Sequence, residues 1–239
     1  MKSFNRIRRL NQVASDVIEK YDFQTAVVAD IATDHGYLAE LLSRNERVSK
    51  VLATDISQKC LDKTNELKQR YKLDKIETKL GDGLEPIEFV DLAILAGIGG
   101  YEIIKILSRQ NTLKNGKNKC NLFVLQPSKN ALELRLFLIE KNIKIVSDFI
   151  VFSSGRFYPI IIADLLQNND TEKSIFNLYF GRDNSIENAD FLRFLNRQVE
   201  DLKFLENMSD SAINGSYDLK TKFDILQTAK NLINKSKGD

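Results

Sequence analysis

The sequence predicts an α/β fold in which a mostly parallel sheet carries helices on both faces. Short apolar runs alternate with amphipathic helical patterns along residues 26–142. The apolar runs have the length of buried strands, and the residues directly after them are mostly Asp or Gly. A length of 239 residues leaves room for one such domain and a smaller appendage.

The elements follow each other in a regular order. Apolar residues at helical spacing predict a first helix over residues 3–20. Further helices are predicted over 37–42, from 57 to about 71, from 100 to 107, and from 128 to 142. Strands are predicted over 26–31, 48–55, 76–80, 91–95 and 121–125, with a closing β pair at 143–152 and 157–165.

The last third of the chain has a different pattern. Residues 188–212 carry Phe191, Leu195, Gln198, Leu202 and Leu205 at heptad spacing. An Asn-Gly turn signal follows at 214–215, and a second apolar stripe runs from 219 to 233. This pattern predicts an antiparallel helical hairpin. Because the two stripes can cover each other within one chain, we expect a monomer.

Composition narrows the function classes. The net charge is +2 and 28% of residues are charged, so composition alone does not predict a nucleic-acid binder. Cys60 and Cys120 lie in apolar settings without a Cys-x-x-Cys pair, which predicts buried thiols in a reducing cytoplasm. The single histidine, His35, cannot build a multi-histidine metal site, so no metal is expected. No apolar run reaches the roughly 18 residues that span a membrane.

Acidic and small residues gather directly after the predicted strands. Asp30 and Asp55 end the first two strands, and Gly-Asp-Gly follows the third at 81–83. Gly-Ile-Gly-Gly follows the fourth at 97–100, and Gln126 follows the fifth. Ligands of parallel sheets bind at the carboxyl ends of the strands, where the strand order reverses. The sequence therefore predicts one ligand pocket at this edge of the sheet.

The loop after the first strand distinguishes between two cofactors. It reads Ala-Thr-Asp-His-Gly at 32–36 and lacks the three glycines of a dinucleotide loop. An Asp in this loop would repel a pyrophosphate, whereas S-adenosylmethionine (AdoMet) has no phosphate and carries a sulfonium and an ammonium. Asp55 is placed to accept hydrogen bonds from ribose hydroxyls, and Asp82 from an adenine amino group. These features predict AdoMet as the cofactor and S-adenosyl-L-homocysteine as its product.

Four motifs together resemble one family. Residues 30–38, DIATDHGYL, are similar to the D-I-G-S-D-H-A-Y-L-P signature of the bacterial tRNA (adenine22-N1)-methyltransferase family. GDGL at 81–84, AGIGG at 96–100 and LQP at 125–127 resemble further motifs of that family, and the resemblance runs in order over 5–165.

Three positions of the first motif depart from the family pattern. Ala32 stands for the usual Gly, Gly36 for the usual Ala, and Ala39 for the usual Pro. All are small, so we expect the pocket to survive.

The resemblance implies a Rossmann-like class I methyltransferase domain and a C-terminal coiled-coil domain. We place the catalytic domain, with its N-terminal helix 3–20, at residues 1–166 and the helical hairpin at 167–239. The implied reaction is AdoMet-dependent methylation of adenine N1 in tRNA. Because N1 lies on the Watson–Crick edge, the base must be exposed or flipped before the enzyme can align it with the methyl group.

Site residues can be assigned on this basis. The cofactor residues lie at strand ends and in the loops after them, and they are Asp30, Ala32, Thr33, His35, Gly36, Tyr37, Asp55, Ile56, Asp82, Gly83, Ala96 and Gly97. Asp34 and Tyr158 are hypothesised to contact the target adenine as catalytic residues. The residues expected around the target base are Gly99, Gly100, Gln126 and Pro127. The N-terminal arginines expected to contact RNA are Arg6, Arg8 and Arg9.

Other interpretations stay open from the residues alone. The chain could be an AdoMet enzyme acting on rRNA, a protein or a small molecule, or a non-catalytic RNA-binding protein with a degenerate Rossmann fold. Asp30 could merely anchor its loop, and His35 could only pack at the helix start. The N-terminal arginines could be a solvated helix face.

Overall fold

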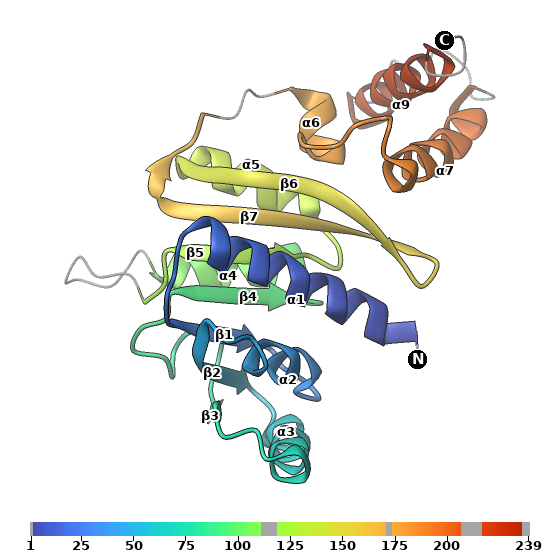
Figure 1. Cartoon of the computed structure of the whole chain (residues 1–239). Coiled ribbons are helices and arrows are strands. Elements are labelled where there is room, and N and C mark those ends of the chain that lie inside the picture. The colour runs from blue at the N-terminus through green and yellow to red at the C-terminus, as the bar shows by residue number, and fades with distance from the viewer. Residues whose placement is uncertain (1, 111–118, 171–173, 207–216, 236–239) are drawn as a thin grey trace. The chain divides into compact units, whose positions relative to one another are not determined.

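A computed structural model describes residues 2–110, 119–170, 174–206 and 217–235 (Figure 1). The chain forms two compact units. The first comprises Met1–Ser147 and Ile160–Thr171, and the second comprises Asp148–Pro159 and Glu172–Asp239.

A seven-stranded sheet confirms the predicted α/β domain with a mostly parallel sheet. Its strands are β1 (Ala26–Ile31), β2 (Val48–Asp55), β3 (Ile76–Leu80), β4 (Leu92–Ala96), β5 (Leu122–Gln126), β6 (Ile143–Ser153) and β7 (Arg156–Asn168). Their order is β3-β2-β1-β4-β5-β7-β6. The pairs from β3 to β5 are parallel, and β7 runs antiparallel to β5. The strand order therefore reverses between β1 and β4, where a ligand crevice is expected.

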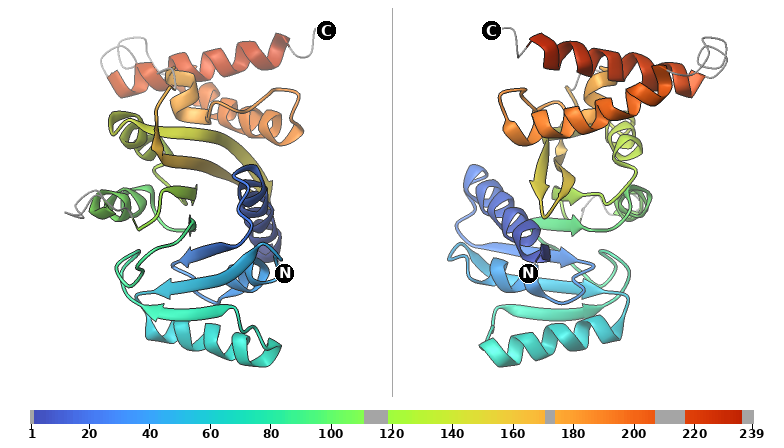
Figure 2. Two further views of the ribbon diagram at one scale, coloured as in Figure 1. Left: turned by 60° about the vertical axis from the view of Figure 1, so that its left-hand side comes forward. Right: turned by 90° about the vertical axis from the view of Figure 1, so that its right-hand side faces the viewer.

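Five helices belong to the first unit. They are α1 (Lys2–Lys20), α2 (Tyr37–Ser43), α3 (Gln58–Tyr71), α4 (Gly100–Gln110) and α5 (Ala131–Glu140). The first two pack against each other on one face of the sheet, with α3 beside α2 near the β3 edge, whereas α4 and α5 pack together on the opposite face (Figure 2). The central strands are covered on both sides, and Val28, Ile94 and Val124 have no exposed surface.

Polar side chains set several element boundaries. The Asp91 carboxylate accepts a hydrogen bond from the Val27 amide over 2.7 Å, and β4 begins one residue later than predicted, at Leu92. Ser57 precedes α3 as predicted, but its hydroxyl makes no capping bond. Instead, the Asp55 carboxylate accepts the Ser57 amide over 2.9 Å.

The second unit contains three described helices, α6 (Ile175–Phe180), α7 (Ala189–Glu206) and α9 (Tyr217–Lys235). The sequence analysis missed α6, a single short segment whose start is capped by the Ser174 hydroxyl. Buried Phe191, Leu195 and Leu205 of α7 share an apolar cluster with Leu226 and other residues of α9. The side chain of Leu202, residues 207–212 of the predicted first helix, and the Asn-Gly turn at 214–215 lie outside the described residues.

The described residues contain neither a membrane-spanning helix nor a metal-binding cluster. No described helix is long and apolar enough to cross a membrane. Among the same residues, no group of three or more His, Cys, Asp or Glu side chains is arranged to hold a metal ion.

Candidate functional site

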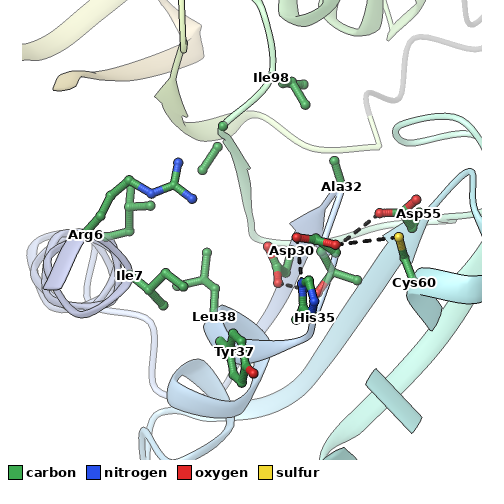
Figure 3. A pocket seen from close by; sticks show the side chains of 15 residues that line it. Arg6, Ile7, Asp30, Ala32, His35, Tyr37, Leu38, Asp55, Cys60 and Ile98 are labelled. Atoms are coloured by element: carbon green, nitrogen blue, oxygen red, sulfur yellow. Dashed lines mark hydrogen bonds and ion pairs between the residues drawn. The ribbon is translucent and has the colours of Figure 1, made fainter. Parts of the chain in front are cut away.

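A cavity of about 560 Å³ opens in the first unit at the carboxyl ends of β1, β2 and β4 (Figure 3). This volume lies within the range of small-molecule sites. The lining residues come from α1, the loop after β1, the start of α2, and the ends of β2 and β4. They are Arg6, Ile7, Leu10, Asp30, Ala32, Thr33, Asp34, His35, Tyr37, Leu38, Asp55, Cys60, Ala96, Gly97 and Ile98.

The loop after β1 has an unusual backbone. Ala32, Asp34 and Gly36 have φ angles of 59°, 53° and 72°, all in the left-handed region. Each non-glycine residue held there costs on the order of 1–2 kcal/mol. Gly36 also faces α3 so closely that a Cβ atom would lie 2.7 Å from Thr64 Cγ2. The loop is therefore held in one strained shape beside the cavity.

Asp30 anchors this loop and lines the cavity. Its side chain is buried, and its Oδ2 accepts the Thr33 hydroxyl over 2.6 Å. Burial raises the pKa of Asp30 to about 6, while hydrogen bonds from Thr33 and the Ala39 amide act in the opposite direction. The anchoring role considered from the sequence is present, together with a place in the pocket wall.

Asp55 closes the far end of the pocket. Its two carboxylate oxygens accept the backbone amides of Asp34 and Ser57 over 3.2 and 2.9 Å. These bonds fix the side-chain orientation, and each oxygen keeps a second lone pair for a ligand donor.

His35 lies between the Asp34 carboxylate and the Lys63 ammonium. Its Nδ1 is 2.7 Å from Asp34 Oδ2, and its Nε2 is 3.1 Å from the Lys63 Nζ. Because a lysine ammonium can only donate, Nε2 must accept, and the partners assign the ring proton to Nδ1, where it is donated to Asp34. The ring also stacks on Tyr37 at a centroid distance of 5.7 Å. His35 thus orients Asp34, whose other oxygen lies 3.7 Å from Cys60 Sγ.

Arg6 reaches the pocket from α1. Its Nη1 donates to Gln126 Oε1 over 2.8 Å, and Gln126 is fully buried at the end of β5. The Gln126 Nε2 in turn donates to the Pro127 carbonyl, which fixes the orientation of the carboxamide. The guanidinium lies beside Gly97, where a Cβ atom would be 3.0 Å from Arg6 Nη1.

A family profile described as "Methyltransferase domain" matches residues 7–161 of the chain. The chain belongs to this methyltransferase family. It is 28% identical over 167 residues to the tRNA (adenine(22)-N(1))-methyltransferase of Bacillus subtilis, with 69% of this chain and 67% of the relative covered. It is 32% identical over 160 residues to a candidate tRNA methyltransferase of Mycoplasma pneumoniae, with 66% of this chain and 70% of that protein covered.

A solved structure has the same fold over a longer stretch. M. capricolum TrmK in complex with S-adenosyl-homocysteine superposes with a TM-score of 0.75 at 24% identity. The superposition covers 94% of this methyltransferase and 97% of that chain.

Most of the predicted cofactor residues meet at the cavity of this methyltransferase. The lining includes Asp30, Ala32, Thr33, His35, Tyr37, Asp55, Ala96 and Gly97, together with Asp34 from the predicted catalytic pair. Tyr158 belongs to the second unit and is not among the lining residues.

The remaining predicted cofactor residues, Gly36, Ile56, Asp82 and Gly83, do not line the cavity. Asp82 forms an ion pair with Arg109 of α4, with 2.5 Å between Oδ2 and Nη1. Gly83 packs on Ile106, and a Cβ atom at Gly83 would lie 2.8 Å from the Ile106 side chain. The Gly83 carbonyl accepts a hydrogen bond from the Thr54 hydroxyl. Ile56 is 74% exposed beside Asp55.

The residues expected around the target base build a support for the pocket. The Gly97 amide donates to the Gln126 carbonyl, the Ser128 amide to Ile98, and the Gly100 amide to Lys129, all within 3.0 Å. A Cβ atom at Gly100 would lie 2.2 Å from the Asn130 carbonyl oxygen, so only glycine fits. Gly100, Gln126 and Pro127 are buried, and neither they nor Gly99 line the cavity.

The three N-terminal arginines have different surroundings. The Arg6 side chain is half-buried in the pocket wall, whereas Arg8 and Arg9 are exposed on α1. Sequence reasoning placed all three together because helical spacing gives the exposed face of a helix but not its distant partners.

Sequence reasoning also missed some pocket residues. Ile7, Leu10, Leu38 and Ile98 contribute apolar wall, and the apolar stripe of α1 was the available signal for the first two. Cys60 was expected to be buried, which is wrong, because it is half-buried and lines the cavity. Cys120 is buried as expected, and burial raises the pKa of its thiol to about 12.

Proposed function

We propose that this chain is an AdoMet-dependent methyltransferase that modifies N1 of an adenine in tRNA, at the position 22 named for the Bacillus subtilis relative. The observation that carries the proposal is the convergence of Asp30, Asp34 and Asp55 on one cavity at the switch point of a methyltransferase sheet. Three carboxylates would repel a dinucleotide pyrophosphate and favour a ligand with a sulfonium and an ammonium. The TrmK structure with S-adenosyl-homocysteine supports the same cofactor.

Different residues contact different parts of the cofactor. Asp55 accepts the ribose hydroxyls, with Ile56 exposed at the same strand end. Asp30 and the loop at 32–37 surround the methionine part, with Ala96 and Gly97 opposite. On the adenine side, Gly83 shapes the turn, and Asp82, which pairs with Arg109 through Oδ2, keeps lone pairs that can accept the adenine amino group.

Methyl transfer requires alignment of the adenine with the methyl group and the later removal of a proton. When bound, AdoMet supplies the electrophilic methyl group. The adenine N1 lone pair attacks in line, so the pocket must hold the exposed base close to that methyl group. The transfer leaves positive charge on the purine, and a proton then leaves from the exocyclic amine. Asp34 is exposed in the cavity and held by His35, which suits it to contact the adenine. Tyr158 is a second candidate contact on the sequence alone.

RNA contact is assigned to surfaces outside the pocket. Arg8 and Arg9 of α1 are exposed and can meet phosphates. The Gly99–Gly100 turn and the Gln126–Pro127 segment shape the wall for the target base from behind.

The domain roles follow from the family resemblance. Residues 1–166 form the catalytic domain, and residues 167–239 form an antiparallel coiled coil in which the packing of α7 on α9 supplies the core. The protein acts as a cytoplasmic monomer, where tRNA is present.

The test is methyl transfer from labelled AdoMet to tRNA transcripts. A transcript with adenine at position 22 should accept one methyl group, which mass spectrometry should place on N1. The matched control transcript carries guanine there, whose N1 has a proton and no free lone pair, and it should accept none. Methylation of both transcripts would favour an AdoMet enzyme with another target. A chain that binds tRNA without binding AdoMet would be a non-catalytic RNA-binding protein.

The catalytic assignment has its own test in single-turnover rates. Asp34→Asn and Tyr158→Phe should each slow methyl transfer at saturating cofactor. Full rates in both variants would remove these two residues from the chemistry.

A further inference from the structure

The side chains that line the cavity carry more negative than positive charge. The lining includes the carboxylates Asp30, Asp34 and Asp55 but only one arginine or lysine, Arg6. His35 also lines the cavity, but its Nε2 accepts from Lys63, so its ring adds no full positive charge in this arrangement. AdoMet has two cationic centres and one anionic group, the α-carboxylate of its methionine part. Among the lining residues, Arg6 is the side chain with the charge that this carboxylate requires.

The Arg6 side chain is fixed in place. Its Nη1 is held by the carboxamide of Gln126, which is itself buried and oriented by the Pro127 carbonyl. A guanidinium has five N–H donors in a rigid planar fork, a geometry that matches a carboxylate and can serve more than one acceptor at once. A pre-oriented arginine loses little conformational entropy when a ligand binds.

Arg6 also stands at the appropriate end of the cavity. In Figure 3 its guanidinium reaches in from α1 on one side, while Asp55 and Cys60 lie on the other. Gly97, at the end of β4, lies directly beside the guanidinium, and both residues line the cavity. If Asp55 binds the ribose, the methionine part of the cofactor extends away from it, towards Arg6.

We propose that Arg6 binds the α-carboxylate of AdoMet and makes the pocket selective for cofactors that carry this group. The assignment rests on the proposed function, because it presupposes AdoMet as the ligand. It moves Arg6 from the RNA-contacting arginines to the cofactor site and makes α1 part of the cofactor pocket. The carboxylate then lies between Arg6 and the strained loop after β1.

The test compares two cofactors in two variants of the full chain. Calorimetry should measure the Kd of AdoMet and of decarboxylated AdoMet, which lacks only the α-carboxylate, for the wild type, Arg6→Met and Arg8→Met. The wild type should prefer AdoMet by about 10- to 100-fold, the range of a charge-assisted hydrogen bond. Arg6→Met should bring this ratio close to one by weakening AdoMet alone. Arg8→Met, an exposed position on the same helix, should keep the wild-type ratio.

The ratio protects the test from folding defects, because general damage to the pocket weakens both cofactors together. An Arg6→Met variant that keeps the wild-type ratio overturns the assignment, whether its two Kd values stay unchanged or rise by the same factor. A normal ratio combined with weaker tRNA binding would return Arg6 to an RNA contact. Failure of the wild type to bind either cofactor would overturn the proposed function itself and this assignment with it.

Discussion

The Arg6 guanidinium donates to the Gln126 carboxamide over 2.8 Å and joins residues 120 positions apart in the sequence. The bond connects α1 to the carboxyl end of β5, and α1 forms one wall of the cavity. Gln126 is therefore expected to act through Arg6 and not by touching the cofactor.

Replacement of Gln126 with Met should loosen Arg6 while preserving much of the buried volume. We expect AdoMet to bind several-fold more weakly and decarboxylated AdoMet to bind unchanged, because only the carboxylate anchor is displaced. Calorimetry on the wild type and Gln126→Met checks this. An equal loss for both cofactors would mean that Gln126 supports the pocket as a whole.

AdoMet binding should depend on pH through Asp30, whose pKa is raised to about 6 by burial. Above that pH the carboxylate is ionised and attracts the cationic cofactor, and below it the group is neutral. The affinity should therefore fall as pH drops through 6, by up to about tenfold per pH unit. Calorimetry between about pH 5 and pH 8 measures the slope. Asp30→Asn should remove most of it, and an unchanged slope in this variant would exclude Asp30 as the titrating group.

The same pKa predicts the opposite trend for the stability of the ligand-free protein. The folded pKa of Asp30 lies above the ordinary value of 3.8, so the folded state holds this proton more tightly than the unfolded state. Its contribution to stability is thus fully present below about pH 4 and is lost as pH rises through about 6. Relative to Asp30→Asn, the wild type should lose up to about 3 kcal/mol of unfolding free energy over that interval. Urea unfolding of both proteins at several pH values measures the difference, and parallel curves would contradict it.

Ala32→Gly should stabilise the protein. Ala32 has a φ of 59°, and glycine adopts this conformation without the steric cost that alanine carries there. The gain should be about 0.5–1 kcal/mol after the larger conformational entropy of glycine in the unfolded chain is subtracted. Thermal unfolding measures it. The matched control is Ala131→Gly at the start of α5, where the backbone is outside the left-handed region. This control substitution should destabilise the protein. Destabilisation by both would mean that Ala32 makes packing contacts that outweigh its strain.

Leu195→Ala should weaken the second unit. Leu195 is fully buried in the cluster that α7 shares with α9, and removal of such a side chain costs about 2–4 kcal/mol. Asn196→Ala changes the adjacent, exposed position and should cost much less. Urea unfolding and limited proteolysis of both variants test this comparison. Equal stability would argue that the pairing of α7 with α9 is not the core of a helical hairpin.

Local sequence patterns were sufficient for the α/β fold of the first unit and for bringing Asp30 and Asp55 to one cavity. The alternation of apolar runs and helical stripes predicted the strands and helices of the first unit, because each element buries its own face. Asp30 and Asp55 could be placed in one pocket because strand ends in a parallel sheet meet at one edge. The short helix α6 was missed, since six residues are too few for a helical period to be recognised.

Only the tertiary structure decided which polar groups face the cavity. Asp82 looked equivalent to Asp55 in the sequence, yet Arg109 of α4 pairs with it. Arg6, Arg8 and Arg9 looked like one basic group, yet only Arg6 lies in the pocket wall. Gln126 was expected near the target base, and the structure shows it buried and bonded to Arg6. The physical reason is the same in each case. Periodicity and spacing report what a residue's own element does, whereas the partner of a charged or amide group is chosen by whichever distant segment packs beside it.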